Sequence, residues 1–157
     1  MKNNKGFSLV ELIIVIAIMA VLVGVLAPTY LQYVEKSKKS NDVSTVDSII
    51  NACEIAAIDP EVMVDTTSSL EFTLTPNGMT ITPTGESATA STTWQDAVET
   101  AIGTDIKLKS QNWDNDAVTF TATRDTATGE VTFAYDTNTA NGNFKSYATA
   151  LTKIQNS

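Results

Sequence analysis

The feature that most constrains this chain is an apolar stretch from Phe7 to Ala27 that contains one carboxylate, Glu11. Its 21 residues reach roughly 30 Å as a helix, which is the thickness of a bilayer's hydrocarbon core. A charge at the membrane centre costs about 2.5–3.5 kcal/mol, so an ionisable residue in such a helix usually has a partner and a purpose. The stretch therefore predicts a transmembrane helix in which Glu11 is functional.

A short basic leader, ending at Gly6, precedes this helix. The string Lys5-Gly6-Phe7-Ser8-Leu9-Val10-Glu11-Leu12-Ile13 resembles the N-terminal signature of type IV pilins and the related pseudopilins. The resemblance covers about the first 30 residues. It implies that a membrane prepilin peptidase cuts between Gly6 and Phe7 and N-methylates the new terminus at Phe7, which makes Glu11 the fifth mature residue.

The chemistry of such a cut gives Glu11 a partner. Cleavage creates a cationic amine at Phe7, and methylation leaves that amine basic. Phe7 and Glu11 stand at positions i and i+4 of one helix, so they can neutralise each other locally. The amine of one chain can also meet Glu11 of the next, and only this pairing sets the axial register of a filament. The resemblance favours the pairing between subunits.

Two simpler interpretations compete with this one. A secretory signal peptide needs an apolar core of only about 7–15 residues and a small-residue cleavage site, whereas here Ala27 is followed by Pro28. A plain membrane anchor explains the length and the basic leader, but it gives no reason for Glu11 beside Gly6-Phe7.

Charge is distributed unevenly along the 157 residues. Residues 1–40 contain five lysines against two acidic residues, and residues 41–157 contain five basic against sixteen acidic residues. The acidic part makes nucleic-acid binding unlikely, because that function needs a basic face. Lys2 and Lys5 fit a cytoplasmic leader, which places the C-terminal domain outside.

Catalytic and metal-binding patterns are scarce. There is no histidine, which removes the usual general base. Asp114-Asn115-Asp116 resembles part of a calcium loop but lacks the glycine and distal glutamate of an EF-hand, and a turn is the better interpretation. Cys53 is the only cysteine; it lies on an apolar helical stripe and is predicted to be buried. The chain therefore departs from pilins that have a C-terminal disulfide. We expect no enzyme activity, no metal and no cofactor.

Gly24 and Pro28 predict a helix break, because Pro28 cannot donate to the carbonyl of Gly24. Beyond them apolar residues recur at helical spacing as far as Ala57, and Asp59-Pro60 ends the pattern. A simple bend at the membrane surface is the alternative to a functional break.

Residues 59–157 are rich in threonine, in segments typical of strands. Pro76-Asn77-Gly78 predicts one hairpin and residues 125–129 a second. Helices are predicted from Trp94 to Ile102, capped by Thr93 and stopped by Gly103, and from Asn143 to Ile154. The expected fold class is α+β and pilin-like: a long N-terminal helix, half transmembrane and half amphipathic, packed on a small antiparallel sheet.

These patterns divide the chain into four expected segments: a leader (1–6), a transmembrane and assembly helix (7–28), its amphipathic continuation (29–58), and an acidic β-domain (59–157). The resemblance implies a structural subunit of a type IV pilus, a homo-polymer formed through the N-terminal helix and serving adhesion, motility or DNA uptake. It implies three partners: the prepilin peptidase, an assembly ATPase and a membrane platform. The chain would cross the cytoplasmic membrane once before assembly and lie in an extracellular filament afterwards. A pseudopilin of a type II secretion system and a membrane-anchored binding module remain open.

Overall fold

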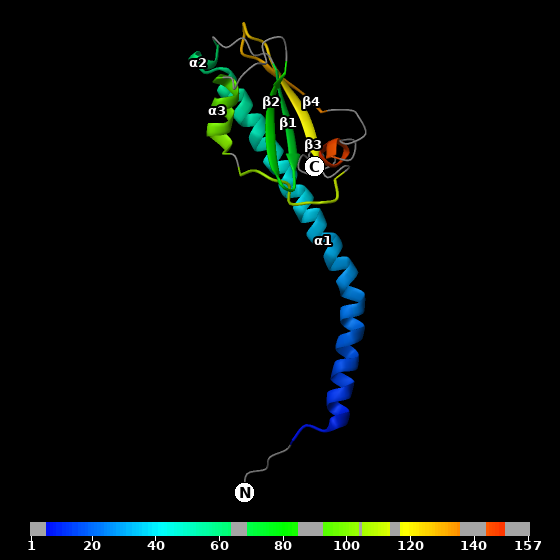
Figure 1. Cartoon of the computed structure of the whole chain (residues 1–157). Helices are drawn as coiled ribbons and strands as arrows, with labels where there is room; N and C mark the ends of the chain where they lie inside the picture. Colours follow the sequence, from blue (N-terminus) through cyan, green and yellow to red (C-terminus); the bar gives the residue numbers. More distant parts are fainter. Residues whose placement is uncertain are drawn as a thin grey trace. The chain divides into compact units, whose positions relative to one another are not determined.

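A computed structural model describes residues 6–63, 69–84, 93–103, 105–113, 117–135 and 144–149. Contacts divide the chain into two compact units, Met1–Ser37 and Lys38–Ser157. Figure 1 shows the elements in order along the chain. Each unit is described by itself.

The predicted long helix is confirmed as α1, Leu9–Ala57, which has 49 residues. It begins two residues later than expected, so Phe7 and Glu11 do not stand within one helix. It ends just before Asp59-Pro60, as expected. Asp59 accepts the backbone N–H of Glu61 at 2.9 Å, which caps the short helix α2, Pro60–Met63. Proline suits the first position of a helix, because the N–H that it lacks would have no partner there.

Both predicted hairpins are confirmed. They contain β1 (Ser69–Thr75) with β2 (Gly78–Thr84), and β3 (Val118–Arg124) with β4 (Val131–Tyr135). The four strands form one antiparallel sheet in the order β2-β1-β3-β4 (Figure 1). The hairpins therefore meet through β1 and β3 in the middle of the sheet.

The helix predicted before Gly103 is α3, Thr93–Ile102, which begins one residue earlier than expected. Gly103 has φ 77° and donates its N–H to the carbonyl of Glu99 at 2.8 Å. Glycine is favoured in this left-handed conformation at a helix end. Trp94 of α3 is fully buried and donates Nε1–H to the carbonyl of Cys53 at 3.3 Å, which ties α3 to α1.

The core lies between the C-terminal part of α1 and one face of the sheet. Inward residues alternate along the strands, as the period of a strand requires, and Phe72 of β1 stacks on Phe120 of β3 with ring centroids 4.9 Å apart. The α1 residues in the core are Val43, Val46, Ile49, Cys53, Ala56 and Ala57. The α+β fold class is thus confirmed.

Residues 144–149 are helical, within the predicted Asn143–Ile154 helix; Leu151 and Ile154 lie outside the described residues. Phe144 is buried, and its ring meets that of Trp113 edge-on at 4.9 Å. This segment belongs to the same core as the sheet.

Candidate functional site

The predicted cleavage site lies in exposed, non-helical backbone. Gly6, Phe7 and Ser8 precede the first turn of α1 and are all exposed, and the side chain of Phe7 is 92% exposed. A peptidase needs a bond that it can reach from outside, and Gly6 and Phe7, on either side of the bond, are both exposed and non-helical.

Ser8 and Glu11 form a capping box at the start of α1. The backbone N–H of Ser8 donates to Oε2 of Glu11 at 2.8 Å, and the N–H of Val10 donates to Oγ of Ser8 at 3.2 Å. These bonds satisfy N–H groups that have no partner within the helix. The carboxylate of Glu11 therefore lies against the peptide group that joins Phe7 to Ser8.

The part of α1 that follows the capping box is apolar on every side. The large hydrophobic side chains from Phe7 to Tyr33 are between 45% and 92% exposed. The most apolar window of α1 has a mean hydropathy of 3.1. Among the described residues, α1 is the one helix that is long and apolar enough to cross a membrane. Its N-terminal half is left uncovered by the residues that the structure describes.

The helix continues through Gly24 and Pro28, which both lie inside α1. A Cβ added at Gly24 would meet nothing within 4 Å, so close packing within the described chain does not explain this glycine. Proline removes one backbone hydrogen bond at this point. The functional helix break at these two residues stays a prediction.

Asp42 is the main residue that the sequence interpretation missed. It lies on α1 at 1% exposure and accepts the backbone N–H groups of Lys109 and Ser110 at 2.7 and 3.0 Å and Nε1–H of Trp113 at 2.8 Å. Lys39, one turn earlier, places its Nζ 4.6 Å from the centre of the Trp113 ring. A buried carboxylate thus fixes a distant segment to α1.

One signal in the sequence could have identified this residue. Asp42 precedes Val46, Ile49 and Cys53 at spacings of four, seven and eleven residues, so it continues their buried stripe. A charged residue on such a stripe needs a buried partner.

Arg124 is a second buried charge, at 2% exposure. It donates from Nη1 to the carbonyl of Val62 at 2.7 Å, and its guanidinium lies 5.2 Å from the centre of the Trp94 ring. It connects β3 to α2 and α3. The alternation of β3 places it on the inward face.

Several pKa shifts follow from these environments. Cys53 is buried, as predicted. Burial, followed by the charge of Glu54, raises the pKa of its thiol to about 12, and a thiol that stays protonated is expected to react slowly. Burial, followed by the charge of Asp47, raises the pKa of Tyr135. Hydrogen bonds from the backbone of Thr128 and Ala127 lower the pKa of the exposed Asp125.

Within the part of the chain that is described, no group of three or more cysteine, aspartate or glutamate side chains is arranged to hold a metal ion. The candidate calcium loop, residues 114–116, lies outside that part.

Comparison with known proteins gives two kinds of match, one to a family model and one to curated relatives. Residues 1–27 match the family model of the prokaryotic N-terminal methylation motif. A fimbrial protein of Pseudomonas aeruginosa is 36% identical over 64 residues, which cover 41% of this chain and 42% of that protein. The type IV major fimbrial protein FimA of Dichelobacter nodosus is 36% identical over 56 residues, 36% of each chain. No solved structure matched.

The chain therefore spans less than half the length of the curated relatives that it matches. The resemblance to type IV pilins that Gly6, Phe7 and Glu11 suggested is confirmed by the methylation motif at residues 1–27 and by the partial matches to fimbrial proteins. The roles of those three residues stay predictions.

Proposed function

We propose that this chain, which shares the N-terminal segment of the type IV pilins, is a structural subunit of a type IV pilus filament. It is cut between Gly6 and Phe7, N-methylated at Phe7, and polymerised with copies of itself through the N-terminal half of α1. The observation that carries the proposal is the methylation motif at residues 1–27 on a helix whose apolar surface is exposed on all sides.

The geometry at the start of α1 supports the processing step. The Gly6–Phe7 bond lies outside the helix, and the capping box begins at Ser8, so cutting would remove no residue that holds the first turn together. The new amine at Phe7 would form one residue from the N–H that Glu11 already accepts. In a filament, we assign Glu11 to the amine of a neighbouring subunit, which would compensate both charges in an apolar setting.

The distribution of charge supports the topology. The basic leader stays in the cytoplasm under the positive-inside rule, residues 7–28 cross the membrane, and the acidic domain lies outside. After assembly, the apolar helices are buried against one another and the acidic domains face the solvent. The prepilin peptidase, an assembly ATPase and a membrane platform are the partners that this route requires.

Two other functions make different predictions. A pseudopilin of a type II secretion system would be processed at Phe7 in the same way but would form no long surface filaments. A membrane-anchored binding module would keep its leader and remain a monomer. The relatives are named as fimbrial proteins, which favours the pilus.

The test is intact mass and N-terminal sequencing of material sheared from cells, alongside the membrane fraction. A sheared species that starts at methylated Phe7 is the expected result. A processed chain found only in membranes would favour a pseudopilin. An uncut terminus at Met1 would overturn the proposal.

A further inference from the structure

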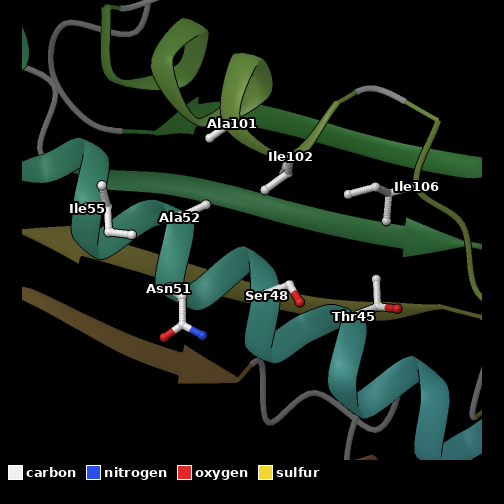
Figure 2. A pocket seen from close by; sticks show the side chains of 8 residues that line it. All are labelled: Thr45, Ser48, Asn51, Ala52, Ile55, Ala101, Ile102 and Ile106. Atoms are coloured by element: carbon white, nitrogen blue, oxygen red, sulfur yellow. The ribbon is translucent and has the colours of Figure 1, made fainter.

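A groove runs along α1 on the side that faces α3 and the segment after it. Two adjoining hollows of about 540 and 450 Å³ form the groove, and they share Thr45 and Ile106. Figure 2 shows Ser48 and Ala52 on its α1 wall and Ile102 on the opposite wall. Small side chains on one wall allow another chain to approach the helix closely.

The two ends of the groove differ in chemistry. Lys107 and Lys109 are exposed at one end, where Asp42 fixes the backbone through the N–H of Lys109. Lys107 also forms a 3.2 Å ion pair with Asp105, which is exposed and therefore weak. The other end contains Ile55, an isoleucine that is 70% exposed.

The opposite flank of α1 has a matching pattern. Asp47 and Glu54 lie seven residues apart on one face of α1, and Ile58 follows four residues later, directly after the end of α1 at Ala57. All three are exposed, Ile58 at 66%. This flank therefore presents two carboxylates and then an apolar side chain.

The groove and this flank lie toward opposite edges of the sheet. Gln95 of α3 donates Nε2–H to the carbonyl of Ile81 on β2 at 3.4 Å, so the groove lies beside the β2 edge. The buried stripe of α1 lies between the groove residues and Asp47 with Glu54, so these two carboxylates lie on the side toward β4. In keeping with this position, burial and then the Asp47 charge raise the pKa of Tyr135 on β4. β2 and β4 are the two outer strands, so one molecule cannot fill its own groove with this flank.

We propose that the groove between α1 and α3 binds the Asp47–Glu54–Ile58 flank of a second copy of this chain. Lys107 and Lys109 meet the two carboxylates, and Ile58 enters the apolar end. Because the two surfaces lie on different sides of one molecule, the contact is heterologous and can repeat without closing, as a filament requires. This inference rests on the proposed function and names the surfaces by which the compact units join.

The order of the groups sets the orientation of the copies. In the groove, the lysine end lies beside Asn41 and Thr45 and the apolar end beside Ile55. On the flank, the carboxylates likewise precede Ile58 in the chain. The two helices therefore run parallel, displaced by roughly 10 Å, since about seven residues separate the two charged centres at 1.5 Å each.

Charge strengthens the choice of partner. Residues 41–157 have sixteen acidic and five basic residues, so two copies repel each other over most of their surfaces. Of those five basic residues, Arg124 is buried, and Lys107 and Lys109 lie together beside the groove. The groove is therefore a place where another acidic copy is attracted, and such complementarity fixes the register of an interface.

The test is charge reversal with rescue, in the full chain expressed in its own cells. One variant combines Lys107→Glu with Lys109→Glu, a second combines Asp47→Lys with Glu54→Lys, and a third contains all four changes. The ratio of sheared to membrane-bound chain should fall at least about tenfold in each of the two double variants, because like charges then face each other across the contact. The four-fold variant should recover to within about twofold of the wild type, since it restores complementarity.

A matched control separates this contact from net charge. Glu61→Lys with Glu130→Lys changes two exposed residues elsewhere, and adding this pair to the Lys107→Glu, Lys109→Glu variant restores net charge without restoring the contact. The inference predicts no rescue by this control. Normal assembly of either paired variant, equal rescue by the control, or no recovery in the four-fold variant would overturn it.

A covalent test does not depend on reversed charges. Ile58→Cys combined with Ile102→Cys, which lines the apolar hollow alone, should give a ladder of disulfide-linked chains when filaments are oxidised, whereas Ile58→Cys with Thr132→Cys, on β4, should not. The absence of a ladder from intact filaments contradicts the docking alone. The absence of wild-type chain from sheared material contradicts the proposed function, so the two failures are distinguishable.

Discussion

Removal of the Asp42 carboxylate should destabilise the compact unit more than any other single loss of a charge on α1. In Asp42→Ala, three donors lose their acceptor: the buried N–H of Ser110, the buried Nε1–H of Trp113 and the partly buried N–H of Lys109. An unsatisfied buried donor costs about 1–3 kcal/mol. We expect the free energy of unfolding to fall by about 3–5 kcal/mol, allowing for water that reaches some of these donors.

Asp42→Asn tests the same network without changing the shape of the side chain. One oxygen remains as an acceptor, but the amide nitrogen then faces an N–H donor. The loss should be about 2–4 kcal/mol, since hydrogen bonds to a charged acceptor are stronger than those to a neutral one. Asp47→Ala is the matched control, because Asp47 is exposed on the same helix and should change stability by no more than about 0.5 kcal/mol.

The assay is urea unfolding of the full chain in detergent micelles, followed by tryptophan fluorescence. Hydrogen exchange at the indole N–H of Trp113 adds a local measurement, since that proton should lose its protection in Asp42→Ala. A loss of stability below about 1 kcal/mol, with the indole still protected, would refute the reasoning, because three orphaned donors cannot cost so little.

Three further predictions concern single groups. Burial raises the pKa of Cys53 to about 12 from an ordinary value of 9.0, so folded protein should resist iodoacetamide at pH 9 while urea-unfolded protein is alkylated, as mass spectrometry would show. Above pH 9 the unfolded chain loses the thiol proton first, so stability should fall as pH rises from 9 toward 12; constant stability over this range would contradict the assignment. Backbone N–H groups of its turn lower the pKa of Asp125. Protection of the amides in the β3–β4 turn from hydrogen exchange should therefore persist at neutral pH and disappear as pH falls through that lowered pKa. Asp125→Asn, which keeps an acceptor but does not titrate, should remove this pH dependence. Glu11→Gln keeps the capping acceptor but removes the charge, and it should abolish sheared filaments. Ser8→Ala weakens the cap and should leave filament assembly intact. If Glu11→Gln assembled and Ser8→Ala did not, the function of Glu11 would be the capping box.

Local patterns predicted the elements well, because their causes are local. Strand alternation and the Asn77-Gly78 turn are sufficient for the first hairpin, and Gly103 ends α3 where its left-handed conformation is needed. The capping box is equally local, since Ser8 and Glu11 are three residues apart, although the sequence interpretation assigned Glu11 only to charge pairing.

The buried charges were harder to predict, because their partners are distant in the chain. Asp42 binds backbone groups 67 and 68 residues away, and Arg124 binds a carbonyl 62 residues away. No short-range pattern contains both members of such a pair. The positions themselves, on a buried helical stripe and on the inward face of a strand, indicate that a partner exists but do not identify it. The groove beside α1 likewise depends on where Ile106 is held after the chain leaves α3.

The exposed apolar half of α1 limits the states in which the chain can exist. Burial of one large apolar side chain contributes about 1.5–3 kcal/mol, so even ten of them amount to roughly 15–30 kcal/mol, more than the stability of a typical domain. The segment must therefore be covered by lipid or by other copies. These two coverings are nearly equal for an apolar surface, because lipid tails are as apolar as leucine. Under the proposed function, polar contacts then decide between membrane and filament. The two contacts that we propose are Glu11 with a neighbouring Phe7 amine, and the lysine-lined groove with Asp47 and Glu54. Loss of either one should leave the processed chain in the membrane.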